Sequence, residues 1–261
     1  MEKKNYTAKY FRESIPEWKF KKDPLIAQWF YRPLSFYISA FCANRGISAN
    51  AVSYFSMLFA IGACVCYFVD NHIVHICGAI IVNLWLLLDC VDGNIARSVK
   101  KQPFGEFADA GSSLLLISFI YISIGYALYC EGGWLVNKGN VIILLLSVFA
   151  TASDAFMRHL YHKYKEELSN LKNKYPEMLG SVGLTHSKPG EMPSLRERIA
   201  EAIGIGGFLP AFILLFTCLE MADIIIYYIF SYNVLKCCLV SYKAIGSAIR
   251  ITKQIEKLPV A

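Results

Sequence analysis

The sequence predicts an all-α integral membrane protein, built as a six-transmembrane-helix bundle with an N-terminal interfacial amphipathic helix. The first observation is composition: the 261 residues are 56% hydrophobic and 18% charged, with a mean hydropathy of +0.41. Soluble domains are about one quarter charged, so this balance excludes a disordered chain, a coiled coil and a nucleic-acid-binding arm. The other two observations are a series of bilayer-length apolar runs and a one-sided distribution of basic residues.

The N-terminal segment, residues 1–50, is expected to be cytoplasmic. Its first part is strongly basic and has no apolar core, so no cleavable signal peptide is expected. Residues 25–43 are apolar but include Arg32 and Pro33. This pattern favours a helix lying on the membrane, with Trp29 and Tyr31 at the level of the headgroups.

Six apolar runs follow, and they form the expected membrane domain, residues 51–245. Within it, the polar stretch 158–204 is expected to be a cytoplasmic link, because prolines and a glycine interrupt it. Residues 246–261 form a cytoplasmic amphipathic tail, suited to a membrane surface or to a dimer contact. The expected spans are about 51–69, 73–91, 112–130, 140–157, 205–221 and 223–243.

Basic residues fix the expected orientation. Of the 26 Lys and Arg residues, 24 fall on one side of the six-span arrangement, and the exceptions are Lys138 and Lys236. Basic loops remain in the cytoplasm, so both termini are predicted to be cytoplasmic, in the inner or plasma membrane of the cell. The net charge of +6 then faces anionic lipid headgroups, not nucleic acid. The nine cysteines show no spacing typical of disulfide frameworks or zinc sites.

Carboxylates gather at the cytoplasmic boundary of the second and third spans. Asp89 and Asp92 are spaced i, i+3 and project from one helix face. Asp109 begins the next span, and Glu106 lies one turn before it. Acids at membrane depth need a partner, and oxygen ligands of this kind suit Mg²⁺, Mn²⁺ or Ca²⁺.

Small residues and one arginine accompany these acids. Gly93 and Ala96 would let a ligand lie close to the helix backbone, and Arg97 supplies a fork of donors for phosphate. Each acid alone could simply mark the end of a span. The whole set, however, predicts a site for a metal and a phosphorylated ligand.

This pattern resembles the signature of the class I CDP-alcohol phosphatidyltransferases, D-x-x-D-G-x-x-A-R followed by G-x-x-x-D-x-x-x-D. The first half matches in full from Asp89 to Arg97, and Gly105 and Asp109 match the second half. Asn50 and Ser53 resemble a further motif of the family at the start of the first span, with Ala49 in place of its proline.

The resemblance implies an enzyme that moves a phosphatidyl-type phospho-alcohol group from a CDP-alcohol donor to an alcohol acceptor, with release of CMP. It implies Mg²⁺ or Mn²⁺ held by Asp89, Asp92 and Asp109. It further implies a homodimer that works in membrane phospholipid or related glycophosphate biosynthesis. The residues implied to hold the CDP moiety are Asn50, Ser53, Gly93, Ala96, Arg97 and Gly105.

The sequence departs from the signature at two places. Seven residues separate Arg97 from Gly105, where the family usually has eight. Ser113 stands where the family has the aspartate taken as the general base, and a serine is no base near neutral pH without activation. Three interpretations follow: Glu106 replaces the base, the acceptor is already ionised, or the site binds CDP-alcohol and metal without turnover.

Other charges within the apolar runs have less definite roles. Asp154 and Arg158 are spaced i, i+4 and could line an acceptor pocket or form a structural ion pair. Lys236 could extend to the cytoplasmic surface or meet a phosphate. A small transporter or membrane scaffold is the rival class, although the sequence lacks the repeats typical of transporters.

Overall fold

A computed structural model of the chain describes residues 5–176, 198–199 and 202–256. Helices make up 82% of the described residues, which contain no strand, and this confirms the predicted all-α class. Five of the helices are long and apolar enough to cross a membrane. Five helices of this length and composition indicate an integral, multi-pass membrane protein.

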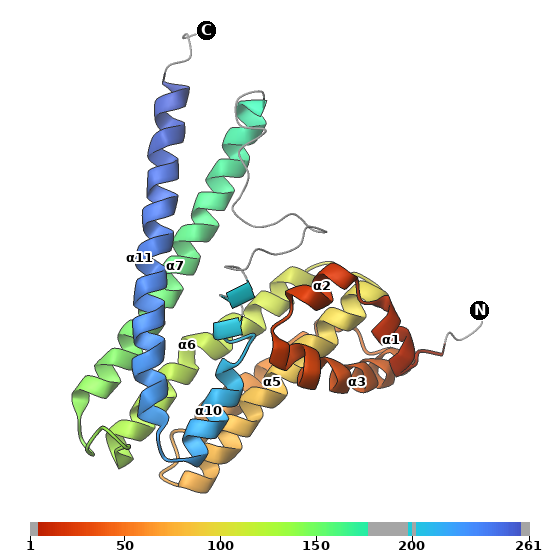
Figure 1. Cartoon of the computed structure of the whole chain (residues 1–261). Coiled ribbons are helices and arrows are strands. Elements are labelled where there is room, and N and C mark those ends of the chain that lie inside the picture. The colour runs from red at the N-terminus through yellow and green to blue at the C-terminus, as the bar shows by residue number, and fades with distance from the viewer. Residues whose placement is uncertain (1–4, 177–197, 200–201, 257–261) are drawn as a thin grey trace.

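The N-terminal segment folds into a group of short helices that pack against the C-terminal part of the helix α5, His72–Ser98 (Figure 1). Thr7 caps the first helix by accepting a hydrogen bond from the Tyr10 backbone N–H. Pro33 lies in the first turn of the last of these helices, where its missing N–H costs no hydrogen bond. The elements are α1 (Ala8–Ser14), α2 (Glu17–Lys22), the π-helix η1 (Ala27–Tyr31) and α3 (Arg32–Asn44).

The five long helices begin where the sequence supplies good caps or breaks. Ser48, Asn71 and Asn140 each precede a helix, and each side chain accepts a backbone N–H from its first turn. The five helices are α4 (Ala49–Cys66), α5 (His72–Ser98), α6 (Gly105–Glu131), α7 (Val141–Lys174) and α11 (Ala222–Ile255).

The predicted count of six long spans is not confirmed. The region expected as the fifth span, about 205–221, contains the helix α10 (Leu209–Cys218), which has 10 residues. A helix of that length covers about 15 Å, half of the hydrocarbon thickness. Gly204, Gly206 and Gly207 precede it in non-helical turns, and Pro210 fits only its first turn.

The pair α7 and α11 is longer than the sequence predicts. Each has 34 residues, or about 51 Å. They lie side by side, begin at the same end of the molecule and extend together beyond the other helices (Figure 1). We call their projecting halves, residues 158–174 and 244–255, the arm. Its seam buries Leu168 and Ile251, and the Tyr164 and Ser247 hydroxyls are 2.7 Å apart.

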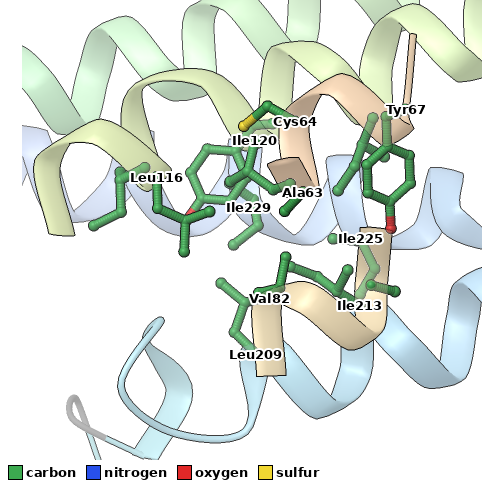
Figure 2. Packing of buried hydrophobic residues seen from close by; sticks show 14 of the residues in the cluster. Ala63, Cys64, Tyr67, Val82, Leu116, Ile120, Leu209, Ile213, Ile225 and Ile229 are labelled. Carbon is green, nitrogen blue, oxygen red and sulfur yellow. The ribbon is translucent and has the colours of Figure 1, made fainter. Parts of the chain in front are cut away.

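The main core lies where α4, α5, α6, α10 and α11 meet (Figure 2). Small residues bring two of these helices close: a Cβ added at Gly78 on α5 would lie 2.8 Å from the Cys66 Cβ and 3.0 Å from the Ala63 carbonyl oxygen on α4. This close packing fixes α5 against its neighbours, and α5 carries most of the predicted site.

Candidate metal and nucleotide site

The second turn from the C-terminal end of α5 presents two carboxylates on one face, as the i, i+3 spacing predicts. Asp92 is 6% exposed and Asp89 is partly buried. Both are held on a regular helix, so their separation is set by the backbone and not by a mobile loop.

Asp109 comes to the same place from α6. The chain between the two helices turns sharply at Phe104, whose backbone is left-handed with φ 58°, and α6 begins at Gly105 directly after it. One oxygen each from Asp89, Asp92 and Asp109 lies within 4.8 Å of the other two. In the part of the chain that the structure describes, no other cluster of three such ligands occurs.

This arrangement fits a divalent cation. Three carboxylates this close repel one another at neutral pH, and a bound cation removes the repulsion. The ligand set is oxygen only, which suits hard cations such as Mg²⁺ or Mn²⁺ and lacks the nitrogen or sulfur atoms that zinc prefers. The three aspartates that the sequence predicts as metal ligands therefore lie close enough together to hold one cation, and their role as ligands stays a prediction.

Ser53 lies beside the carboxylates, but its contact differs from the predicted one. Its hydroxyl donates a 2.6 Å hydrogen bond to Asp92 Oδ2 and is 2% exposed. A hydrogen bond of this kind fixes the orientation of a ligand carboxylate. In this structure Ser53 supports Asp92, and its predicted contact to the nucleotide stays a prediction.

Asn50 contacts the loop that leads into α6. Its Nδ2 donates a 2.8 Å hydrogen bond to the Pro103 carbonyl. Its Oδ1 is buried without a hydrogen-bond partner and lies 3.5 Å from the position of a Cβ at Gly105. Buried polar atoms are nearly always paired, so this oxygen is available to a donor group of a ligand.

The Arg97 side chain folds back over the turn that carries the carboxylates. A Cβ added at Gly93 would lie 2.8 Å from a guanidinium nitrogen of Arg97. Arg97 is exposed, and Ala96 beside it is partly buried. Arg97 therefore places a positive charge next to the metal ligands, at a position open to a phosphate.

The two candidates for a general base have different surroundings. Ser113 is partly buried on α6, one turn after Asp109. Its neighbour Ser112 is buried and is hydrogen bonded to the Ser56 hydroxyl and to Trp85 Nε1. The Glu106 side chain is 91% exposed and lies 3.3 Å from Lys101 Nζ.

Asp154 and Arg158 form an ion pair, one of the two arrangements that the sequence allows. Arg158 Nε donates a 2.6 Å hydrogen bond to Asp154 Oδ2, and Asp154 is 5% exposed. Lys236 lies within electrostatic range of this pair, with its Nζ 5.3 Å from the ring centre of Tyr232. Two cations therefore share one carboxylate at this place between α7 and α11.

The sequence model of the CDP-alcohol phosphatidyltransferases matches residues 47–185, just over half of the chain. The chain belongs to this family. A search of curated proteins gave no match.

As a CDP-alcohol phosphatidyltransferase, the chain belongs to a transferase family that acts on CDP-alcohols. Members of the family typically use divalent metals, which agrees with the group of three aspartates. The matched region contains every predicted site residue. It excludes α11 with Lys236, and it excludes residues 1–46.

Sequence analysis missed one set of buried polar residues next to the site of this phosphatidyltransferase. Asp23 is 7% exposed, Arg32 4% and Asn94 0%, and the three are linked by hydrogen bonds. Arg32 alone indicated such a set in the sequence, because a charged residue in an apolar run needs a partner. Its acid lies nine residues earlier, outside the apolar run.

Proposed function

We propose that the protein transfers a phospho-alcohol group from a CDP-alcohol donor to an acceptor hydroxyl, with release of CMP, in membrane-lipid or related glycophosphate biosynthesis. The observation that carries this proposal is the convergence of Asp89, Asp92 and Asp109 within the region that matches the family. The match to the family includes all three aspartates, whereas no observation of this chain favours the rival class, a small transporter or membrane scaffold.

The site residues suit the parts of this reaction. Asp89, Asp92 and Asp109 would hold Mg²⁺ or Mn²⁺, which neutralises the diphosphate and the CMP that leaves. Arg97 offers fixed donors to phosphate oxygens. The Asn50 Oδ1 can accept a hydrogen bond from the donor substrate. Gly93 lets the Arg97 guanidinium lie close to the helix, and Ala96 and Gly105 leave space for the cytidine diphosphate beside the backbone.

In the transfer step, the acceptor oxygen forms a bond to the phosphorus that carries the donor alcohol. The bond from that phosphorus to the bridging oxygen of the diphosphate breaks, and CMP leaves with that oxygen. A neutral hydroxyl acceptor must also lose its proton, so the step needs a base.

The base is the open part of the mechanism, because Ser113 cannot act alone. Glu106 would need to leave Lys101 and turn toward the site, directly or through water. Alternatively, the acceptor is a phosphate or carboxylate that is already ionised and needs no base. In the third alternative the site binds CDP-alcohol and metal but has lost turnover.

The Asp154–Arg158 pair and Lys236 are candidates for an acceptor pocket. Together they carry an excess of one positive charge, and Arg158 keeps 35% of its side chain exposed. An exposed cation near the end of an apolar segment attracts anionic groups. An anionic acceptor would also agree with the replacement of the usual base by Ser113.

Several features support a six-crossing arrangement with both termini in the cytoplasm. α7 and α11 end at the same end of the molecule, and α11 begins at the other end (Figure 1). The chain between Lys174 and Ala222 must therefore return across the bundle, and α10 forms part of that return. Exposed Trp29, Phe30 and Tyr37 favour placing the N-terminal helices on the membrane surface. A homodimer remains a proposal from the family resemblance.

The direct test is CMP release from several CDP-alcohols by the purified full chain, with pools of lipid and polar acceptors and with Mg²⁺ or Mn²⁺. Asp109→Asn should lower the rate at least about 100-fold, because a lost metal ligand costs several kcal/mol of transition-state stabilisation. Asp70→Asn is the matched control, since Asp70 is exposed in the turn between α4 and α5. The proposal fails if no CMP is released with any donor and acceptor.

A second variant, Ser113→Asp, separates the three interpretations of the base. If Glu106 serves as a weak substitute, the new carboxylate should raise CMP release. If the acceptor is an ionised phosphate or carboxylate, the added negative charge should lower it. A wild-type protein that binds CDP-alcohol without turnover, and gains turnover with Ser113→Asp, supports the third interpretation.

A further inference from the structure

A buried polar network joins the N-terminal segment to the helix that carries the metal ligands. Arg32, the first residue of α3, is 4% exposed although it is charged. Its Nε donates a 2.7 Å hydrogen bond to Asp23 Oδ2, which neutralises it. Lys19 Nζ lies 2.9 Å from the other oxygen of Asp23.

The other side of the Arg32 guanidinium faces α5. Its Nη1 donates to Asn94 Oδ1 at 2.9 Å and approaches the Cys90 carbonyl at 3.4 Å. Both acceptors lie in the stretch of α5 from Asp89 to Asn94, which also holds the two metal carboxylates of that helix. Arg32 is also close enough to Asp89 for their charges to attract.

Two serines of α3 complete the contact with the same turn. Asn94 Nδ2 donates to Ser35 Oγ at 2.9 Å and to Ser39 Oγ at 3.2 Å. The Ser39 hydroxyl in turn lies 3.5 Å from the Val91 carbonyl. From α4, Ser53 donates to Asp92 Oδ2 at 2.6 Å. The turn that bears Asp89 and Asp92 is therefore held by α3 and by α4.

A network this polar and this buried is costly unless every group is paired. Its place beside the carboxylates suggests a role beyond attachment, because groups behind metal ligands set their orientation and their affinity for the metal. We infer that Arg32 is a positioning residue for the metal centre, and that the N-terminal segment from Asp23 to Ser39 forms part of that centre. This inference rests on the proposed function only for the presence of a divalent metal at the three aspartates.

The charge of Arg32 and its directed hydrogen bonds have opposite effects on the affinity of the site for a divalent cation. The positive charge of Arg32 near Asp89 repels a metal ion and lowers the affinity. The fork of N–H donors holds the turn with Asp89 and Asp92 in place and raises the affinity. Lysine keeps the charge but cannot supply the same fork. Arg32→Lys therefore leaves the electrostatic effect in place and removes the directed contacts.

The test is Mn²⁺ binding by the full-length protein in detergent, followed by electron paramagnetic resonance of free Mn²⁺. Arg32→Lys should weaken Mn²⁺ binding about 10-fold, the lower end of the range for lost outer contacts. Arg45→Lys is the matched control: Arg45 is the C-cap of the same helix and is exposed, and its side chain contacts only the Phe41 ring among the contacts described. Its Mn²⁺ affinity should equal that of the wild type.

A second variant tests the same inference if Arg32→Lys does not fold. Asn94→Ala removes the acceptor on α5 and leaves the Arg32–Asp23 pair intact, so it should also weaken Mn²⁺ binding. Wild-type affinity in either folded variant overturns the inference and leaves the proposed function standing. If the wild type binds Mn²⁺ but releases no CMP, the proposed function fails while the positioning role stands. If the wild type binds no Mn²⁺ at all, both fail.

Discussion

At the scale of single residues, the buried ion pair of the N-terminal segment gives the protein a defined response to acid. Burial is the largest influence on the Asp23 carboxyl and raises its pKa, but attraction to Arg32 and Lys19 outweighs it, so the pKa lies below the ordinary 3.8. Because the pKa of Asp23 is lower in the folded than in the unfolded chain, its ionised carboxylate stabilises the fold at pH values above the unfolded pKa. This contribution to the free energy of unfolding is lost as the pH falls below about 4.

We therefore expect the melting temperature of the full chain in detergent to fall between pH 6 and pH 3, and Asp23→Asn to flatten that fall. At pH 6 this variant should lose about 3 kcal/mol, because Arg32 stays buried without its partner. Glu13→Gln is the control, since Glu13 and Lys9 form an exposed pair at 3.8 Å. An acid response in Asp23→Asn as steep as in the wild type would contradict this assignment.

Single residues also show what the sequence could predict. Asp89 and Asp92 follow helical spacing, and Asp109 begins the next apolar run at the same boundary, so the convergence of the three could be predicted from the sequence. Arg32 could not be placed in the same way. Its partners, Asp23 and Asn94, lie at very different separations along the chain, and only the packing of α3 on α5 brings them together.

At the scale of helices, the lengths of the apolar runs predict the membrane-spanning parts, but they underestimate how far α7 continues into the arm. The fourth apolar run ends near residue 157, but α7 continues to Lys174 because a narrow stripe that includes Leu168 packs on α11. The predicted amphipathic tail, residues 246–261, is helical on α11 as far as Ile255, and residues 257–261 lie outside the described part of the chain. The sequence did not predict that the tail packs on the end of α7. That end is rich in charged residues, which conceal its narrow apolar stripe.

The arm offers a matched pair of substitutions two residues apart. Ile251 is 5% exposed in the seam with α7, whereas Ile249 is 52% exposed on the outer face of α11. Ile251→Asp places a carboxylate in an apolar contact and should destabilise the arm by about 2 kcal/mol. Limited proteolysis in detergent should then cut residues 158–174 faster than in the wild type. Ile249→Asp should leave the cleavage rate unchanged, and equal cleavage of both variants would argue against a packed arm.

At the scale of the whole molecule, the direction of α7 and α11 can be combined with the distribution of charge. Both helices end in the basic arm, and the opposite end of the bundle carries Lys138 as its one predicted basic residue. Basic segments stay in the cytoplasm. We therefore expect that two helices of about 51 Å, in a hydrocarbon layer of about 30 Å, leave about 20 Å of arm in the cytosol. The aspartates of α5 and α6 would face the same side, where water-soluble CMP can leave.

Epitope tags can test this orientation in intact cells. One tag is inserted after Gly139, in a turn where nothing lies within 4 Å of an added Cβ, and the other follows Ala261. In spheroplasts, or in cells without an outer wall, an antibody should reach the first tag directly and the second only after permeabilisation. An insertion that keeps CMP release shows that the tagged protein is folded. If the C-terminal tag is reached without permeabilisation, the chain crosses the membrane an odd number of times or is inverted, and the arm lies outside the cytosol.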